Sequence, residues 1–258
     1  MSDSNQYPPQ TGLYKIKIKE GGTSWREYDR LRLEISVGQS YHEGAKMEAT
    51  LKWAKSRFPH VSILVNDTLQ RFNLMFEQGL SEDVAERITW REGETWIERH
   101  RPFLDGSSLY RWNEWKTRPD YERALTESRR IYTNNHAFSA AVDEAINDVW
   151  FRRVGTDSIF LPERKEEFFF HSQNYLLEET AVFALAYKEL PGISAYPGSF
   201  QKMWAMFVDS AIKGPLKGLN NAHCMRIDFQ RNKSYRPAQK TPATEQNVWV
   251  PDAATAWA

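Results

Sequence analysis

The stretch RLRLEISVGQSYHEGAKM (residues 30–47) decides the fold. Apolar and polar residues alternate from position 31 to position 36, which predicts a strand with one apolar face. Its other face carries Arg32, Glu34 and Ser36, because successive side chains of a strand point to opposite faces. A turn rich in glycine and polar residues follows, and residues 43–57 have the pattern of a helix.

The segments around this stretch extend it into a sheet with covering helices. VSILVND (61–67) predicts a short, continuously apolar strand, which is common in parallel sheets covered on both faces. Strand, turn, helix and strand with short links form a βαβ unit. A long apolar helix over residues 165–190 and two late strands, GISAYP and HCMRIDFQR, follow. We therefore expect a single α/β domain with a mostly parallel sheet flanked by helices.

Length and composition are those of an ordinary globular protein. The 258 residues are 41% hydrophobic and 26% charged, enough to bury a sizeable core. A net charge of zero excludes a basic coat for nucleic acid, although it leaves a local patch open. The single Cys224 cannot form an internal disulfide, and no apolar run approaches the ~18 residues of a membrane span. We expect a cytoplasmic protein.

The ends of the chain differ in composition from its middle. Residues 1–12 are expected to form a disordered leader, and residues 237–258, rich in Pro, Thr and Ala, a flexible tail. The domain is expected to span residues 13–236. Within it, Ser81 has the character of an N-cap, and the helix that it begins is expected to stop at Pro102.

Two strand ends carry candidate site residues. Ser36 ends the first strand of the βαβ unit and Asp67 ends the second. Ligands of open α/β sheets bind beyond the carboxyl ends of the strands, so both residues are expected in one crevice. The simpler interpretation of Ser36 is a turn residue, a role for which serine is common.

The long helix places Tyr175, Glu178 and Glu179 on a largely apolar surface. Tyr175 and Glu179 are neighbours at i and i+4, and Glu178 is close at i+3, so spacing alone does not choose between the glutamates. A carboxylate in an apolar setting costs several kcal/mol unless it is paired or protonated. One interpretation is a site for a cation such as an α-ammonium group. The other is a glutamate that extends to water.

Motifs of other chemistries are missing from the sequence. It has no HExxH and no paired Cys/His spacing, so a zinc site is not expected. It has no Walker loop and no GxGxxG after a strand, so no nucleotide cofactor is expected. GQSYH (38–42) lacks the second glycine of the GxSxG nucleophile elbow.

Three separated motifs resemble those of the tRNA-dependent cyclodipeptide synthases. SVGQSY (36–41) is similar to the family's Ser-x-x-(Asn or another residue)-Ser-Tyr at a strand end, and YLLEE (175–179) to its Tyr-x-x-x-Glu on a long helix. Tyr196-Pro197, with Gln39 in place of Asn, resembles the Xaa-Tyr-Pro subfamily. The likeness spans roughly residues 28–200. It departs at Ala181, where the family usually has proline, and in a slightly short interval before Tyr196.

The resemblance implies a Rossmann-like domain similar to the catalytic domain of class I aminoacyl-tRNA synthetases. It also implies an enzyme that makes a cyclic dipeptide, a 2,5-diketopiperazine, from two aminoacyl-tRNAs by a ping-pong mechanism. Ser36 would hold the first aminoacyl group covalently, and Tyr196 would assist the proton transfers. Tyr175 and Glu179 would bind the ammonium group of the first aminoacyl group, and Gln39 would lie in the substrate site.

Glu34 raises a question of substrate. In the family, the residue two before the nucleophilic serine is glycine or another small residue and borders the pocket of the first amino acid. A carboxylate there suits a guanidinium, which pairs with it bidentately, so arginyl-tRNA is one expected substrate. The resemblance extends to a branch that makes arginine-containing products. The alternative is that Glu34 pairs with Arg32 on the same face.

Binding of tRNA needs cations, and relatives use a basic helix. Candidates here are Arg87, Arg91, Arg99 and Arg101, although several acidic residues stand among them, as on an ordinary solvated helix face. The lysines at positions 15, 17 and 19 are an alternative row. We expect a monomer. Two other functions stay open: a serine esterase or thioesterase using Ser36 or Ser40, and a non-catalytic aminoacyl-tRNA-binding protein.

Overall fold

The computed structural model describes residues 12–20, 25–197, 202–208 and 212–235. The predicted leader of residues 1–12, except Gly12, and the predicted tail of residues 237–258 lie outside the described residues. The candidate site residues named above all lie inside them.

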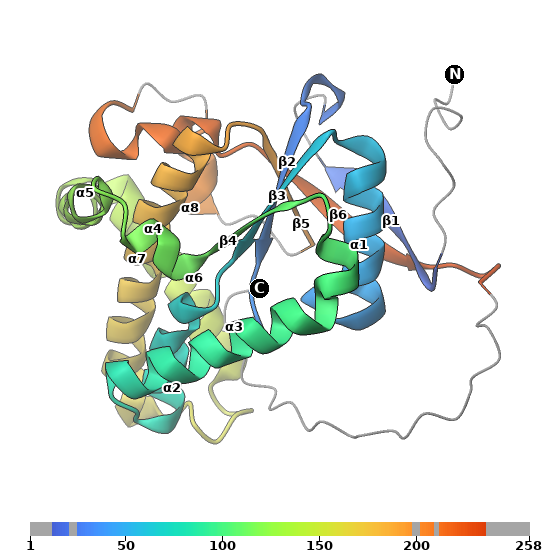
Figure 1. Cartoon of the computed structure of the whole chain (residues 1–258). Helices are drawn as coiled ribbons and strands as arrows, with labels where there is room; N and C mark the ends of the chain where they lie inside the picture. The colour runs from blue at the N-terminus through green and yellow to red at the C-terminus, as the bar shows by residue number, and fades with distance from the viewer. Residues whose placement is uncertain (1–11, 21–24, 198–201, 209–211, 236–258) are drawn as a thin grey trace.

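A six-stranded sheet runs through the described part of the chain in the order β1-β6-β5-β2-β3-β4 (Figure 1). Adjacent strands from β6 to β4 are parallel, and β1 is antiparallel to β6 at the edge. The strands are β1 (Tyr14–Glu20), β2 (Arg30–Ile35), β3 (His60–Val65), β4 (Ser108–Arg111), β5 (Ile193–Tyr196) and β6 (Cys224–Arg231). The predicted α/β class with a mostly parallel sheet is confirmed.

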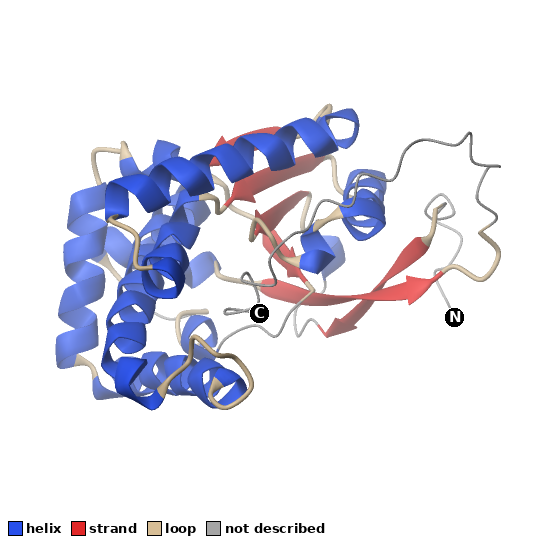
Figure 2. Cartoon of the chain, turned by 90° about the horizontal axis from the view of Figure 1, so that it is seen from below, coloured by secondary structure: helices blue, strands red, loops and turns tan. Residues whose placement is uncertain are grey.

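Helices cover the sheet. The α-helices are α1 (Gly44–Arg57), α2 (Arg71–Gln78), α3 (Glu82–Leu104), α4 (Trp112–Lys116), α5 (Tyr121–Asn134), α6 (His136–Arg153), α7 (Lys165–Glu189) and α8 (Lys202–Ala205). Short 3-10 helices are η1 (Trp25–Glu27), η2 (Ser40–His42), η3 (Thr68–Gln70), η4 (Pro162–Arg164) and η5 (Gly214–Asn221). The sheet is twisted, and the strand pair near the N-terminus projects beyond the helices (Figure 2).

The two faces of β2 follow the predicted alternation, and both are buried. Leu31 and Leu33 belong to a core that includes Trp53 of α1 and Trp96 of α3. Arg32 and Glu34, on the opposite face, are 0% and 5% exposed. The polar face of this strand therefore lies against protein, because the end of α7 covers it: Tyr187 contacts Glu34, and Arg32 donates to the Leu190 carbonyl.

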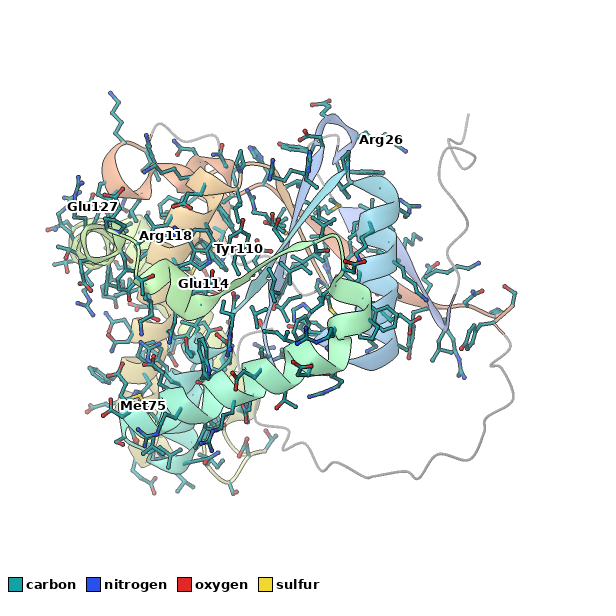
Figure 3. The ribbon with its side chains drawn as sticks, in the orientation of Figure 1. Arg26, Met75, Tyr110, Glu114, Arg118 and Glu127 are labelled. Carbon is teal, nitrogen blue, oxygen red and sulfur yellow. The ribbon has the colours of Figure 1, made fainter. Side chains whose placement is uncertain are left out.

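A second core lies between α7 and the helices that surround it. The side chain of Trp115 shows how aromatic residues fill this region: Tyr110 of β4 and the guanidinium of Arg118 each lie 5.4 Å from its ring. Figure 3 labels Tyr110 and Arg118. Arg118 also forms an ion pair with Glu189 at the end of α7, at 3.2 Å. These contacts fix α7 against the carboxyl end of β4.

The prediction that Pro102 ends its helix is wrong, because α3 continues through Pro102 to Leu104. Proline removes one hydrogen bond from a helix, to the carbonyl four residues earlier. Only two residues of α3 follow Pro102, so little of the helix depends on the missing bond. Ser81 is the N-cap as predicted, although its side chain makes no capping hydrogen bond.

Candidate functional site

The parallel strands bring several candidate residues to one edge of the sheet. Residues 36 and 67 follow β2 and β3, and Tyr196 is the last residue of β5. Because β2 pairs in parallel with both β3 and β5, the carboxyl ends of these strands meet at the same edge. The predicted convergence of strand ends is therefore present.

A tight turn presents Ser36 after β2. Ser36 is partly exposed, and its carbonyl accepts a hydrogen bond from the backbone N–H of Gln39 at 3.2 Å. Gly38 between them has φ +89°, a left-handed conformation that costs a residue with a Cβ about 1–2 kcal/mol. Glycine at position 38 therefore lets the chain reverse directly behind the Ser36 hydroxyl. Gln39 itself is buried in this turn.

Two tyrosine hydroxyls lie next to Ser36. The Ser36 Oγ is 3.5 Å from the hydroxyl of Tyr196, which in turn hydrogen-bonds the hydroxyl of Tyr41 at 2.8 Å. Burial raises the pKa of Tyr196 to about 12, so its phenol is neutral at neutral pH. A neutral phenol can donate one proton and accept another, and the distance to Ser36 closes to a hydrogen bond with a small movement.

Tyr175 and Glu179 of α7 form the second part of the site. Tyr175 is 1% exposed, and its hydroxyl accepts a hydrogen bond from the side-chain amide of Gln70 at 3.2 Å. Burial, followed by the charges of Glu179 and Tyr196, raises the pKa of Tyr175 well above its usual value. Charges shift a pKa strongly only at short range, so Tyr175, Tyr196 and the Glu179 carboxyl lie close together. Tyr196 also lies next to Ser36, so all four residues form one site.

Glu179 is a buried carboxyl that stands apart from the ion pairs around it. It makes no hydrogen bond through its side chain and no ion pair with any residue in the described ranges. Burial and then the charge of Glu34 raise its pKa to about 8. Such a carboxyl is neutral when the site is empty, and a cation beside it would favour the charged form.

Glu178, the adjacent residue, is fully engaged. Its two carboxylate oxygens accept hydrogen bonds from Arg71 at 2.8 and 2.5 Å, and the Trp112 indole N–H donates a further bond at 2.8 Å. Arg71 also binds Glu82 at 3.0 Å. This cluster ties α7 to α2, α3 and α4. Its geometry favours a structural role for Glu178, in place of the expected contact with substrate.

Asp67 is likewise engaged inside the protein. Its carboxylate accepts hydrogen bonds from the Arg111 guanidinium and from the backbone N–H of Thr68, both at 2.7 Å. Asp67 is 0% exposed, and the Arg111 guanidinium stacks over the Trp90 ring at 3.2 Å. Asp67 therefore lies at the expected edge of the sheet. Its pairing with Arg111 favours a structural role, in which it joins the ends of β3 and β4, and not contact with a ligand.

Glu34 sits in a buried network between β2, β5 and α7. Its Oε1 accepts hydrogen bonds from Ser194 at 2.6 Å and from the Tyr187 hydroxyl at 3.1 Å. The Arg32 Nε is 3.9 Å from the same oxygen. The alternative that Glu34 pairs with Arg32 thus has a direct basis. Burial raises the pKa of Glu34, and the charge of Arg32 and the bonds from Ser194 and Tyr187 oppose that rise.

Arg32 anchors that network. Its guanidinium donates to Ser194 Oγ at 3.1 Å, to the Leu190 carbonyl at 2.9 Å and to the Asn221 carbonyl at 2.8 Å. It also lies over the Tyr187 ring at 3.9 Å. Because its donors point in several directions at once, this one guanidinium joins the end of α7 and η5 to the sheet.

The four candidate arginines of α3 divide into two pairs. Arg99 binds Glu43 at 2.6 Å, and Arg101 pairs with Glu98. Arg87 and Arg91 are exposed and make no ion pair with any residue in the described part of the chain. The alternative lysine row on β1 is exposed too, with Lys19 paired to Asp228 at 3.3 Å.

Sequence reasoning missed two residues that shape the site, Gln70 and Ser194. Tyr41 belongs to the SVGQSY motif, and His42 was predicted to be an extra base or, with more weight, a solvated turn residue. The solvated role is wrong, because His42 is buried. Gln70 and Ser194 reach the site only through folding, from η3 and β5. No local pattern identifies either of them.

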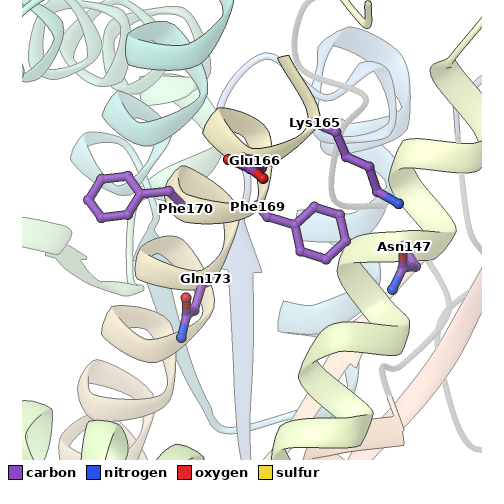
Figure 4. Close-up of a pocket in the computed structure, with 6 residues that line it drawn as sticks. All are labelled: Asn147, Lys165, Glu166, Phe169, Phe170 and Gln173. Carbon is purple, nitrogen blue, oxygen red and sulfur yellow. The ribbon is translucent and has the colours of Figure 1, made fainter. Parts of the chain in front are cut away.

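A pocket elsewhere is separate from these residues. It has a volume of about 490 Å³ and lies between α6 and the first half of α7 (Figure 4). Asn147, Lys165, Glu166, Phe169, Phe170 and Gln173 line it, and no candidate site residue does. Across the described ranges no three His, Cys, Asp or Glu side chains gather as metal ligands would. No helix in those ranges is both long enough and apolar enough to cross a membrane.

No protein-family model and no curated protein matches the sequence. Solved structures do match the fold. A cyclodipeptide synthase (CDPS) from Fluoribacter dumoffii superposes with a TM-score of 0.75 at 24% identity, over 86% of this chain and 100% of that one. A cyclodipeptide synthase from Candidatus Glomeribacter gigasporarum, bound to Phe-tRNAPhe, gives a TM-score of 0.60 at 18% identity, over 84% and 92%.

A Mycobacterium tuberculosis protein matches with a TM-score of 0.60 at 14% identity, over 89% of this chain and 100% of that one. Its structure is described as demonstrating that cyclodipeptide synthetases are related to type I tRNA synthetases. All three superpositions extend over most of this chain. This chain therefore has the fold of the cyclodipeptide synthases.

Proposed function

We propose that this protein is an aminoacyltransferase that makes a cyclic dipeptide from two aminoacyl-tRNAs. The observation that carries the proposal is the position of Ser36: partly exposed at the carboxyl edge of a cyclodipeptide synthase fold, 3.5 Å from the Tyr196 hydroxyl. The proposal includes the Xaa-Tyr-Pro type, which rests on Gln39 and Tyr196-Pro197.

The first half-reaction follows from the hydroxyls. The Ser36 Oγ attacks the carbonyl carbon of the first aminoacyl ester, and the ester bond to the tRNA breaks. The Ser36 proton passes to the departing tRNA oxygen, which leaves as a hydroxyl, and the amino acid stays on Ser36 as an ester. Because an aminoacyl ester is already activated, the serine needs less activation than a protease serine.

The ammonium of that amino acid is proposed to lie between Tyr175 and Glu179. An α-ammonium group has a pKa of about 7.7–8.0, and the pKa of the buried Glu179 is raised to about 8. The bound ammonium favours the ionised form of Glu179, which releases its proton to solvent; the carboxylate then takes a proton from the ammonium, which frees the amine as a nucleophile. Neither oxygen of the Glu179 carboxyl is committed to another residue in the described ranges.

Ring closure uses the same atoms. The freed amine attacks the ester of the second aminoacyl-tRNA, the second tRNA leaves, and a dipeptide remains on Ser36. Its terminal amine then attacks the Ser36 ester, which releases the ring and returns a proton to the serine oxygen through the Tyr196 hydroxyl. Covalent capture makes this last step intramolecular, an advantage that reaches ~7–11 kcal/mol in well-oriented systems.

Expression in bacteria tests the class of reaction. We expect cyclic dipeptides in the medium of cells that express the wild type, detected by mass spectrometry, and none with Ser36→Ala. The matched control is Ser40→Ala, which removes an exposed hydroxyl from the same turn. Hydrolysis of simple nitrophenyl esters without tRNA would instead indicate an esterase. Binding of aminoacyl-tRNA with no product would indicate a non-catalytic binding protein.

We further propose arginyl-tRNA as the first substrate, held through Glu34. The supporting observation is the effect of the Glu34 charge on Glu179, which brings the two carboxyls into one neighbourhood. A guanidinium would offset the charge of both carboxyls, whereas an apolar side chain would not. We also propose a cytoplasmic enzyme, because its proposed substrates are aminoacyl-tRNAs, and a monomer without a metal or cofactor.

Single aminoacyl-tRNAs decide this point. We expect radiolabelled arginine, but not leucine or phenylalanine, to attach to Ser36. Glu34→Gln keeps the shape of the side chain and should lower arginine labelling. If Glu34→Gln lowers only the melting temperature and leaves the amino-acid preference unchanged, the arginine proposal is wrong. Glu34 then only stabilises the buried network around Arg32.

A further inference from the structure

His42 is buried beside the proposed nucleophile, yet it contacts the backbone of Ser36. Its Nδ1 accepts the backbone N–H of Ser36 at 2.9 Å, and the side chain is only 3% exposed. A histidine near a nucleophilic serine usually suggests a general base. The contact to the backbone N–H points elsewhere.

We propose that His42 is a positioning residue, whose neutral imidazole fixes the Ser36 backbone so that the Ser36 hydroxyl faces Tyr196. This role deepens the proposed function and rests on Ser36 as its nucleophile. No motif of the family resemblance assigns it, since the match ends at Tyr41.

The hydrogen bond fixes the protonation of the ring. A nitrogen that accepts an N–H cannot also carry a proton, so the proton of the neutral ring is on Nε2. Nδ1 also lies 3.3 Å from the Ser36 carbonyl, a contact that would need the other tautomer, and the shorter distance to the Ser36 N–H favours the proton on Nε2. Burial lowers the pKa of His42 to about 3, which keeps the acceptor available at every working pH.

His42 is itself held from three sides. Its carbonyl accepts the Trp96 indole N–H at 2.8 Å, and its own N–H donates to the Gln39 carbonyl at 2.8 Å. The rings of Tyr41 and Tyr196 meet the imidazole edge-on, with centroids 4.6 and 5.6 Å away. The backbone of His42 thus joins the turn after β2 to α3, and its imidazole packs against the ring of Tyr196.

The Ser36 N–H needs this partner because it lies past the paired part of β2. The pairing of β2 with β3 ends at Ile35. The next hydrogen bond at that end runs from the Asn66 N–H to the Ile35 carbonyl. It uses the carbonyl of the Ile35–Ser36 peptide and leaves the N–H of the same peptide without a partner in the sheet. Without the imidazole, the partly buried N–H of Ser36 loses its acceptor, and the Ser36 peptide is less firmly held. A displacement of ~1 Å at a reacting atom can cost about 10²-fold in rate.

Three variants test the inference in the full-length protein. His42→Asn places an amide oxygen near the position of Nδ1 and keeps an acceptor, whereas His42→Leu keeps the bulk and removes it. The control His100→Leu removes another buried imidazole, one that bonds to the Trp96 carbonyl of its own helix. Each is measured for single-turnover aminoacylation of Ser36, for melting temperature, and for hydrogen exchange of the Ser36 amide.

The expected pattern separates positioning from packing. His42→Leu should lower the acylation rate by about 10²-fold. His42→Asn should stay within ~5-fold of the wild type, because its acceptor remains. His100→Leu should lower the melting temperature without that loss of rate. If His42→Leu acylates as fast as the wild type, or if all three rates simply follow the melting temperature, the inference is wrong.

The amide measurement keeps this test independent of the proposed function. If the wild type forms no aminoacyl-Ser36, the proposed function fails, and the inference is judged on hydrogen exchange. Faster exchange of the Ser36 amide in His42→Leu, with protection kept in His42→Asn, supports the inference. Equal protection in all variants overturns it.

Discussion

Two adjacent glutamates of α7 hold opposite protonation states because their partners differ. Burial alone would raise the pKa of Glu178, but the hydrogen bonds and charge of Arg71 outweigh it and hold the pKa below its usual value. Glu179 has no such partner in the described structure, and burial with the charge of Glu34 raises its pKa to about 8. One turn of helix therefore places a structural anion beside a titrating acid.

We predict that Glu179→Gln stabilises the protein at pH 8 relative to the wild type. The pKa of Glu179 rises on folding from 4.5 to about 8, so folding favours its protonated form. The wild type therefore keeps full stability below pH 4.5 and loses it as the pH rises to about 8. The difference reaches a few kcal/mol, since one pKa unit corresponds to about 1.36 kcal/mol.

Denaturant unfolding of wild type and Glu179→Gln at pH 5, 6.5 and 8 measures that difference. Subtracting the two curves removes other groups that titrate in this range, such as Glu77, whose pKa burial raises to about 7. Glu178→Gln is the contrast: it breaks a buried pair and should cost about 3–5 kcal/mol at neutral pH. A constant gap between wild type and Glu179→Gln from pH 5 to 8 would show that Glu179 is not buried as described.

At the scale of elements, α3 crosses the carboxyl end of β3 at very close range. A Cβ added to Gly93 would lie 2.3 Å from Oδ2 and 2.6 Å from Cβ of Asp67. Asp67 cannot move aside easily, because Arg111 and the Thr68 N–H hold its carboxylate. Glycine at this position lets the helix pack against the Asp67–Arg111 pair.

We predict that Gly93→Ala destabilises the protein although alanine favours helices. The gain in helix propensity is about 1 kcal/mol, and the clash with a fixed carboxylate is expected to exceed it by ~1–3 kcal/mol. Chemical unfolding measures the net effect. The control Thr95→Ala, at an exposed position on the same helix, should be neutral or slightly stabilising. Equal stability of Gly93→Ala and the wild type would contradict the close approach of α3 to Asp67.

The same helix carries the proposed tRNA-binding arginines. Arg87 and Arg91 have no acidic partner in the described residues, whereas Arg99 and Arg101 are paired, so the first two are free to meet phosphates. We predict that the double variant Arg87→Glu/Arg91→Glu binds tRNA more weakly than the wild type. Its affinity should also depend less on salt, with a log–log slope that is shallower by about 1 for each phosphate that the protein no longer neutralises.

Two matched double variants complete that binding series. Arg99→Glu/Arg101→Glu has the same charge change and should have the smaller effect. Lys15→Glu/Lys17→Glu tests the alternative row on β1. Fluorescence anisotropy with labelled tRNA at several salt concentrations gives affinity and slope together. Weaker binding by the lysine variant alone would move the tRNA surface from α3 to β1.

At the scale of the whole molecule, the site exists because parallel strands end together. The carboxyl ends of β2 and β5 supply Ser36 and Tyr196, and α7, packed on one face of the sheet, supplies Tyr175 and Glu179 (Figure 1). The antiparallel pair β1–β6 lies at the edge of the sheet. The sheet thus collects side chains that are far apart in the chain, as open α/β sheets do at this edge.

We propose that residues 13–236 form the folding unit and predict that the flanking segments add little stability. Because the side chain of Asn232 also donates to the Gly12 carbonyl at 3.0 Å, the trimmed chain starts at Gly12 and ends at residue 236. Its melting temperature should lie within ~3 °C of the full chain, a difference below about 1 kcal/mol. A larger fall in calorimetry, or loss of product, would place the flanking segments within the working unit.

The sequence by itself determined the order of elements, the faces of β2 and the residues at the strand ends. These follow from periodicity and turn chemistry, which act between near neighbours and stay readable in a short window. Periodicity also placed Tyr175 near both glutamates. The stop at Pro102 was wrong because the local rule ignores how little of the helix follows that residue.

Only the tertiary structure decided which side chains are free to act. Glu178 and Arg71 are 107 positions apart, and Glu34 and Ser194 are 160 apart, so no local pattern reveals that these pairs meet. Folding commits Glu178 and leaves Glu179 uncommitted, and it turns His42 toward the Ser36 backbone. Burial and pairing set the protonation of a side chain, and both depend on neighbours that only the folded chain brings together.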